Sequence, residues 1–254
     1  MDQGPAVARL TICIDPGLDY FLKRKKYCSP LVYNLTRRAS IKDIIEAHSL
    51  PHTEVGRIRL NGKPVGFDHV PMPGDHVEVD AVDPPFNVQH PSLLRPHPLD
   101  KIHFIADANV IRLGRLLRLA GFDTVYARSD TDGGIAQMAT SQGRIVLTRD
   151  IGLLKRKIIE FAKYIRSDRP YDQLEEVIHF FGIESQLNLL SRCAHCNSRI
   201  EPVLKQKIEH LLELKTKRYY QSFFRCTGCG QVYWKGSHFE RVQERFCLLG
   251  GGKG

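Results

Sequence analysis

The sequence predicts an α/β protein with a central parallel sheet, preceded by a small domain of mixed strands and followed by a cysteine-rich unit. Three observations lead to this prediction. Short apolar runs that end at an acidic residue alternate with helical segments between residues 101 and 150. Prolines cluster at 84–98, and two Cys-x-x-Cys pairs stand near the C-terminal end. Alternating strands and helices favour parallel pairing with helices on both faces of the sheet.

Each element of the central segment has its own signal. The expected strands are 101–106, 122–127 and 144–148, and the expected helices are 109–120, 135–141 and 173–181. The strands are short apolar runs stopped by polar residues, as in buried parallel strands. In the first helix the leucines recur at helical spacing, whereas Arg112, Arg115 and Arg118 fall on the other side.

Aspartates follow the expected strands: Asp107 the first, Asp130 and Asp132 the second, and Asp150 the third. Ligands of parallel sheets bind outside the carboxyl ends of the strands, so we expect these acids to share one edge. Clustered carboxylates need a cation, and Mg²⁺ or Mn²⁺ with oxygen ligands suits phosphodiester hydrolysis. The alternative is that Asp107 and Asp150 are helix N-caps. Asp172 is expected to cap the last helix and is a weaker candidate for a fourth carboxylate.

Composition limits the class of protein. The 254-residue chain has a net charge of +9 and a pI near 9.2, which favours a polyanionic partner such as RNA. No apolar run approaches the ~20 residues of a membrane span. The opening residues lack the apolar region of a signal peptide, so we expect a cytoplasmic protein with no membrane partner.

The N-terminal segment predicts a β-grasp, ubiquitin-like domain. Its expected strands are 7–14, 30–36, 58–60 with 65, and 76–82, and its expected helix is 41–48. Ser40 is the expected helix cap, and Asn61-Gly62 marks a tight turn. Four histidines in this segment have no acid or cysteine at ligand spacing, so we interpret them as surface residues: His48, His52, His69 and His76.

The prolines at 84–98 predict a stiff, extended linker. The predicted domains are therefore 1–88 (β-grasp), 89–100 (linker), 101–186 (α/β) and 187–254 (cysteine-rich).

The cysteine pairs are the most specific local signal in the chain. Cys193 and Cys196 form the first pair, and after 29 intervening residues Cys226 and Cys229 form the second. Four thiolates at this spacing predict a structural zinc ribbon with a helical insertion at 202–215. A redox pair is the competing interpretation. Three other cysteines are expected to be ordinary thiols: Cys13, Cys28 and Cys247.

Two stretches of the N-terminal segment, IKDIIEAHSLPHTEVGRIRLNGKPV and GDHVEV, resemble the ubiquitin-like domain that precedes Mut7-C proteins, a relative of bacterial sulfur carriers. Such carriers need a free Gly-Gly carboxyl terminus after the last strand. Here the chain continues with Asp83-Pro84-Pro85-Phe86, so a carrier function is not expected. Docking of a protein partner and orientation of the substrate are both expected roles for this domain, and the sequence does not decide between them.

The central segment resembles the Mut7-C RNase domain, a branch of the PIN nuclease fold. The similar stretches are FIADANVIRLGRLLRLAGFDTVY, SDTDGGIAQMA, GRIVLTRDIGLLKRK, RPYDQLEEVIHFFGI, CAHCN and FFRCTGCGQVYWKGSH. The resemblance implies a three-layer PIN-like domain that hydrolyses RNA with Mg²⁺ or Mn²⁺. It assigns ligand roles to Asp107 and Asp150, and the middle acid to Asp130, with Asp132 second.

We therefore expect a metal-dependent ribonuclease acting on tRNA, rRNA or mRNA. Arg112 and Arg149 are expected to neutralise the phosphate. The alternative from another class is a non-catalytic RNA- or ribosome-binding adaptor that uses the basic surface and the ribbon. The acids favour the enzyme, because a pure binder of polyanions gains nothing from gathering carboxylates.

Overall fold

The computed structural model describes residues 9–127, 131–236, 239–240 and 243–244. The chain divides into two compact units, Met1–Lys101 with Thr131–Tyr164 and Ile102–Asp130 with Ile165–Gly254. The α/β segment is thus shared between the units, whereas the predicted domain bounds treat it as one piece. Among the described residues, no helix is both long and apolar enough to cross a membrane.

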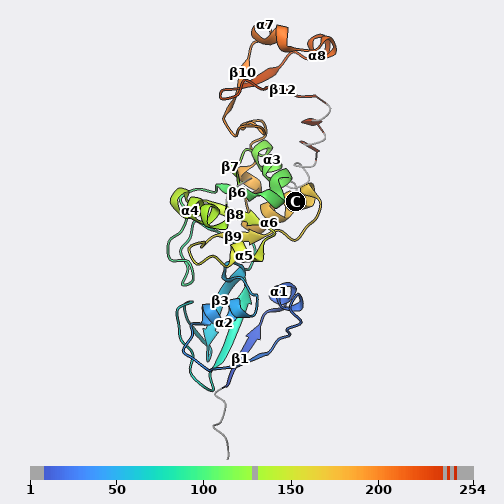
Figure 1. Cartoon of the computed structure of the whole chain (residues 1–254). Coiled ribbons are helices and arrows are strands. Elements are labelled where there is room, and N and C mark those ends of the chain that lie inside the picture. The colour runs from blue at the N-terminus through green and yellow to red at the C-terminus, as the bar shows by residue number, and fades with distance from the viewer. Residues whose placement is uncertain (1–8, 128–130, 237–238, 241–242, 245–254) are drawn as a thin grey trace, which may run out of the picture. The chain divides into compact units, whose positions relative to one another are not determined.

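The first unit contains a five-stranded sheet with the strand order β2-β1-β5-β3-β4 (Figure 1). Its strands are β1 (Arg9–Ile14), β2 (Leu31–Asn34), β3 (Val55–Leu60), β4 (Lys63–Pro64) and β5 (His76–Ala81). β1 is parallel to β5 and antiparallel to β2. Helix α2 (Ile41–Ala47) begins after Ser40, whose hydroxyl accepts the Asp43 N–H at 3.2 Å. The predicted β-grasp arrangement is confirmed.

A short helical segment between β1 and β2 was not predicted. The turn η1 (Pro16–Leu18) leads into α1 (Asp19–Lys23), and the side chains of Leu18, Phe21 and Leu22 are buried. Five residues are too few for a helical period to show in the sequence. A further turn, η2 (His52–Glu54), precedes β3.

The rest of the first unit belongs to the α/β segment. It comprises α4 (Asp132–Gln142), β8 (Ile145–Thr148), α5 (Ile151–Leu154) and β9 (Ala162–Tyr164). β8 and β9 pair in parallel, with Thr148 opposite Tyr164. Gly143 ends α4 in the left-handed region at φ 57°. The parallel pairing expected for this segment is confirmed.

A buried ion pair joins the β-grasp to β9. Lys163 Nζ lies 3.3 Å from Glu54 Oε2, and both side chains are nearly inaccessible. The other oxygen of Glu54 accepts the Tyr164 N–H at 2.7 Å. Because both carboxylate oxygens have partners, the charge is compensated inside the protein.

Arg95 corrects the expectation of an extended linker. Its buried guanidinium donates to the carbonyl oxygens of Val55 at 2.9 Å, Thr53 at 2.8 Å and Glu160 at 3.0 Å. Burial lowers the pKa of Arg95 to about 10, opposed by the charges of Glu54 and Glu160, so it stays charged at neutral pH. The proline-rich segment is therefore packed into the first unit.

His52 corrects the expectation that the histidines lie at the surface. Its side chain is buried, with Nδ1 2.6 Å from Glu46 Oε1 and Nε2 2.8 Å from the Ile159 carbonyl oxygen. These two contacts connect α2 with the segment before β9. The sequence gives no sign of them, because the spacing of possible metal ligands says nothing about burial.

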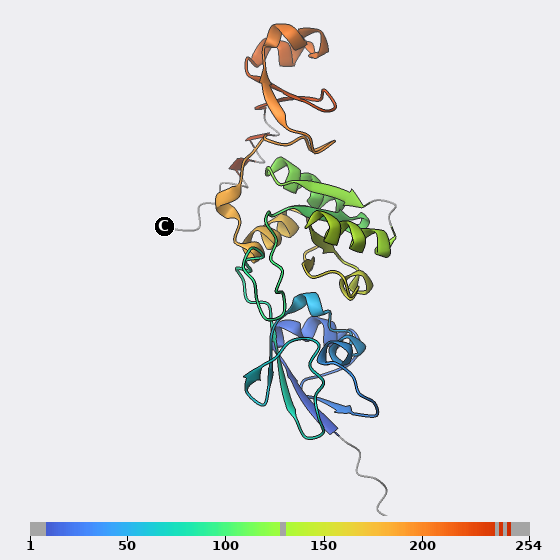
Figure 2. The same ribbon diagram turned by 90° about the vertical axis from the view of Figure 1, so that its left-hand side faces the viewer.

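The second unit begins with β6 (Phe104–Asp107), η3 (Ala108–Val110), α3 (Ile111–Leu119) and β7 (Thr124–Ala127) (Figure 2). β6 and β7 pair in parallel, and α3 packs against α6 (Pro170–Phe181). Gly114 lets α3 approach the strands closely: a Cβ there would lie 2.7 Å from Ala106 Cβ and 2.8 Å from the Tyr126 ring. Helix α6 starts at Pro170 after the N-cap Arg169, so Asp172 lies in its first turn and is not the cap.

The second unit ends in an antiparallel sheet of order β10-β11-β12. After η4 (Glu184–Gln186), its elements are β10 (Ile200–Val203), α7 (Lys205–Ile208), η5 (Glu209–Leu211), α8 (Leu214–Tyr219), β11 (Phe223–Cys226) and β12 (Val232–Trp234). The short helices lie between β10 and β11, beyond the strand ends farthest from the cysteines (Figure 1). The predicted helical insertion is thus present as short pieces.

We expect Gly114→Ala to destabilise the protein by about 1–3 kcal/mol, because the added methyl overlaps Ala106 and Tyr126 in a packed interface. The matched control is Gly133→Ala in α4, where the nearest atom to an added Cβ is 3.9 Å away. It should be neutral or stabilising by up to about 1 kcal/mol. Urea unfolding measures both; an unchanged Gly114→Ala midpoint would contradict this packing.

Candidate functional site

The four predicted cysteines converge in the second unit. One sulfur from each of Cys193, Cys196, Cys226 and Cys229 lies within 4.8 Å of all the others. The Cys196–Cys226 and Cys193–Cys229 sulfur pairs are 3.3 and 3.6 Å apart, far longer than a disulfide bond of about 2.05 Å. Four sulfurs around zinc at about 2.3 Å would lie about 3.8 Å apart. The cluster therefore fits a tetrahedral metal ion, and it is the only such group of three or more metal-ligating residues among the described residues.

Local backbone geometry points the thiols inward. The Cys196 N–H donates to Cys193 Sγ at 3.5 Å, and the Gly228 and Cys229 N–H groups donate to Cys226 Sγ at 3.4 Å. Gly228 is required at its position, because a Cβ there would lie 2.9 Å from Ser198 Cβ. Amide donors aimed at sulfur favour the thiolate form that metals bind.

Hydrogen bonding and burial shift the pKa values of the thiols in different directions. Hydrogen bonds with the Ser198 side chain and backbone lower the pKa of Cys196 to about 6. Burial raises the pKa of Cys226. The backbone of Gln231 lowers the pKa of Cys229, but burial and the other cysteines outweigh it and raise that pKa to about 12. Four thiolates so close together need a cation to be ionised at once.

Arg118 ties the first cysteine pair to the α/β segment of the same unit. Its guanidinium donates to the carbonyl oxygens of His195 at 2.8 Å, Ala194 at 3.3 Å and Thr124 at 2.7 Å. Its Cζ lies 3.5 Å from the centre of the Tyr126 ring. The side chain is 5% exposed, and burial lowers its pKa. The prediction that Arg118 lies on the polar face of its helix is wrong.

A second set of contacts reinforces this attachment. The Asn197 amide donates to Asp123 Oδ1 at 2.9 Å, and its oxygen accepts the Thr124 N–H at 3.2 Å. Arg192 pairs with Asp123 at 3.2 Å. Tyr233 packs against the cysteine cluster, with its hydroxyl 3.1 Å from Cys193 Sγ.

Asp107 is the last residue of β6 and the N-cap of η3. Its Oδ1 accepts the Ala108 N–H at 2.6 Å and its Oδ2 accepts the Asn109 side-chain N–H at 2.7 Å. Asp107 is 9% exposed.

In the first unit, Asp150 follows β8 as the N-cap of α5, and its Oδ1 accepts the Gly152 N–H at 2.7 Å. Its own N–H donates to Thr148 Oγ1 at 2.9 Å. Asp132 lies in the first turn of α4 and pairs with Arg156 at 3.4 Å. Asp130 lies outside the described residues. The alternative in which Asp107 and Asp150 cap helices is thus observed, and their role as metal ligands stays a prediction.

The two predicted phosphate ligands also belong to different units. Arg112 is exposed near the start of α3, and Arg149 is half-buried directly after β8. Cys13 and Cys28 are free thiols, as expected, and Cys247 lies outside the described residues.

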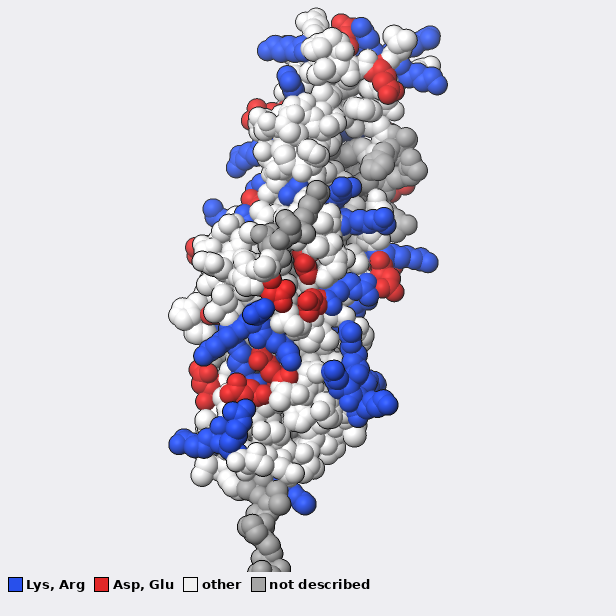
Figure 3. Space-filling model, viewed as in Figure 1, with Lys and Arg blue, Asp and Glu red and all other residues white. Residues whose placement is uncertain are grey.

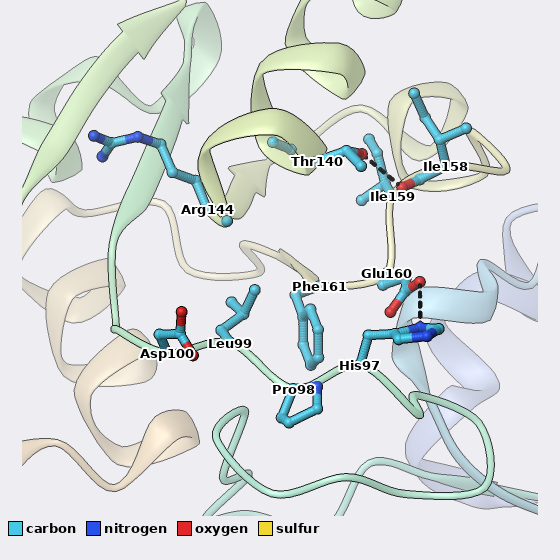
Figure 4. A pocket seen from close by; sticks show the side chains of 12 residues that line it. His97, Pro98, Leu99, Asp100, Thr140, Arg144, Ile158, Ile159, Glu160 and Phe161 are labelled. Carbon is cyan, nitrogen blue, oxygen red and sulfur yellow. Dashed lines mark hydrogen bonds and ion pairs between the residues drawn. The ribbon is translucent and has the colours of Figure 1, made fainter.

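The first unit has a hollow of about 260 Å³, whose lining side chains are drawn in Figure 4. Residues just before β8 and β9, including Arg144 and Phe161, line it, and Thr140 donates to the Ile158 carbonyl oxygen at 3.0 Å on its wall. It therefore lies at the amino ends of the strands, where parallel sheets seldom bind substrate.

Comparison with protein families finds the Mut7-C RNAse domain at residues 102–246 and the Mut7-C ubiquitin domain at residues 8–87. A search of curated proteins and a search of solved structures found no match.

We expect the purified protein to hold about one zinc per chain, because the sulfur cluster fits tetrahedral coordination. Cys226→Ser should lose the metal, whereas Cys28→Ser, at an exposed free thiol, should retain it. Elemental analysis measures both. Wild-type protein that contains no zinc, or a Cys226→Ser variant that keeps its zinc, would contradict the assignment of a zinc site to these cysteines.

We expect Arg118→Met to destabilise the second unit by about 2–4 kcal/mol, because buried carbonyl oxygens lose their donor. Arg115→Met on the exposed face of α3 is the control and should stay within about 0.5 kcal/mol. Urea unfolding followed by the fluorescence of Trp234, the single tryptophan, reports on the ribbon. Equal midpoints for the two variants would show that the contact contributes little.

Proposed function

Because the chain belongs to the Mut7-C RNAse domain family, we propose that it is a metal-dependent ribonuclease that hydrolyses RNA phosphodiester bonds. The observation that carries this proposal is the family match across 102–246. The matched region includes Asp107 at the end of β6 and Asp150 two residues after β8, both of which are strands of parallel pairs. RNA is the proposed substrate, and the cytoplasm is the proposed location.

In this proposal Asp107, Asp130 and Asp150 bind Mg²⁺ or Mn²⁺, with Asp132 as the second choice for the middle acid. The donor chemistry supports it, because hard divalent cations prefer carboxylate oxygens. The bound cation would supply charge neutralisation to the phosphodiester in hydrolysis. Amide and side-chain donors keep the Asp107 carboxylate in one orientation, and the Gly152 amide does the same for Asp150.

Two arginines complete the proposed site. Arg112 and Arg149 would attract and orient the phosphate, since a guanidinium matches phosphate oxygens with two parallel hydrogen bonds. The ion pair of Asp132 with the half-exposed Arg156 is weak in water, so Asp132 could exchange this partner for a cation.

The second candidate is a non-catalytic RNA-binding adaptor. The observation that favours it is that Asp107 and Asp150 both act as helix caps, a role that needs no metal. A family-typical ribbon and a net charge of +9 serve either candidate. Only cleavage separates them.

We expect Asp107→Asn and Asp150→Asn each to lower Mn²⁺-dependent RNA cleavage by about 100-fold or more, because a neutral amide is a poor ligand for a hard cation. Asparagine caps a helix almost as well as aspartate, so the unfolding midpoints should not move. RNA binding should persist or tighten as repulsion falls.

The matched control is Asp43→Asn in the first turn of α2, which should cleave like wild type. Undiminished cleavage in both site variants would place the catalytic centre elsewhere. Wild-type protein that binds RNA but never cleaves it with Mg²⁺ or Mn²⁺ would favour the adaptor.

A further inference from the structure

The β-grasp carries four consecutive cationic residues, 23–26, at the end of α1. All four side chains are exposed, and Figure 3 shows a group of Lys and Arg side chains over this part of the molecule. Within the described residues, only Lys23 among them forms an ion pair, with Asp19 at 3.2 Å. The turn therefore holds three positive charges that no acid of the described chain balances.

Backbone hydrogen bonds hold this turn in one conformation. The N–H groups of Lys25 and Tyr27 both donate to the Leu22 carbonyl oxygen, at 3.0 and 3.1 Å. The Lys26 N–H donates to the Lys23 carbonyl oxygen at 3.1 Å, and Lys26 itself is left-handed at φ 59°. The backbone that carries these four charges is thus held in place.

The turn is anchored to the last residue of β9. Tyr164 is buried, and its hydroxyl lies 3.0 Å from the Tyr20 hydroxyl. Arg24 Nη1 donates to the same Tyr164 hydroxyl at 3.0 Å. The rings of Tyr20 and Tyr164 lie 5.3 Å apart, and Phe21 packs edge-on against Tyr164 at 5.5 Å.

This anchor places the turn at the carboxyl ends of β8 and β9, where Asp150 lies. Tyr164 lies opposite Thr148 in the parallel β8–β9 pair, and the Thr148 hydroxyl accepts the Asp150 N–H. Both therefore mark the carboxyl ends of these strands, and all these residues belong to the first unit.

We propose that residues 23–26 of the ubiquitin-like domain bind the phosphate backbone of single-stranded RNA next to Asp150. The inference rests on the proposed nuclease function, because it names where the substrate of that site is held. Carboxylates repel a polyanion, so a nuclease centre needs fixed cations beside it. Tyr20 and Tyr27 stand before and after these cations in the chain. Tyr20 packs against Tyr164 and Tyr27 packs against His48, yet the two residues are 38% and 40% exposed, so the exposed part of each can contact an unpaired base.

The test is Lys25→Glu with Lys26→Glu in the full chain. The matched control is Arg37→Glu with Arg38→Glu, which changes the net charge equally at two exposed residues of the same domain. The control lies toward the other end of β1: it follows β2, whose Asn34 pairs with Arg9, whereas α1 follows Ile14.

The probe is a fluorescein-labelled single-stranded oligouridine, without added Mg²⁺ or Mn²⁺ so that binding is measured apart from cleavage. The Lys25→Glu, Lys26→Glu protein should bind roughly tenfold more weakly at about 0.15 M salt, and its salt slope should fall by about 1.4, since each lost phosphate contact removes about 0.7. The control should stay within about twofold. Circular dichroism confirms that each variant folds.

Equal losses in both double variants would reduce the effect to net charge and overturn the proposal, as would unchanged binding. Wild-type protein that binds anionic vesicles but no oligouridine would assign the turn to a membrane surface instead. Binding that depends on Lys25 and Lys26 in a protein that cleaves no RNA would retain this inference while removing the nuclease. RNA cleavage and RNA binding that are unchanged in the Lys25→Glu, Lys26→Glu protein would retain the nuclease and overturn this inference.

Discussion

The buried guanidinium of Arg118 is the contact on which the second unit depends. It leaves α3 inward, stacks on Tyr126, and satisfies carbonyl oxygens of both β7 and the first cysteine pair. A cation that is 5% exposed persists only where several acceptors compensate its lost hydration. The cysteine cluster is therefore tied to β7 through the hydrogen bonds of one side chain.

The first unit follows the same physical rule with different residues. Arg95 donates hydrogen bonds to carbonyl oxygens of η2, β3 and the segment before β9. Glu54 pairs with Lys163 and accepts the Tyr164 N–H. Such buried charges are destabilising unless each has its partners, so they allow one arrangement of the surrounding chain and reject others. The β-grasp is held against β9 by polar contacts that have direction.

Local patterns in the sequence were enough for much of this architecture. β6 and β8 coincide with short apolar runs of the sequence. The four cysteines meet because two short turns each supply a pair. Burial of Arg118 could not be predicted, since two of its three acceptors lie 76 and 77 residues away and no spacing rule links them to it. The acids show a different limit: an aspartate after a strand looks the same in sequence whether it caps a helix, binds a cation or does both, so their ligand role stays a prediction.

Glu54 shows that the bounds of the family matches and the bounds of the folded units differ in this protein. The family match begins at residue 102, yet the ammonium of Lys163 and the amide of Tyr164 find their acceptor in the segment before it. A chain trimmed to that match would lack Glu54, and it would also lack Arg95 and His52, which bond to the carbonyl oxygens of Glu160 and Ile159 just before β9. The bounds of a family match are thus not the bounds of a folded unit here, because buried residues of one matched segment are the partners of buried residues of the other.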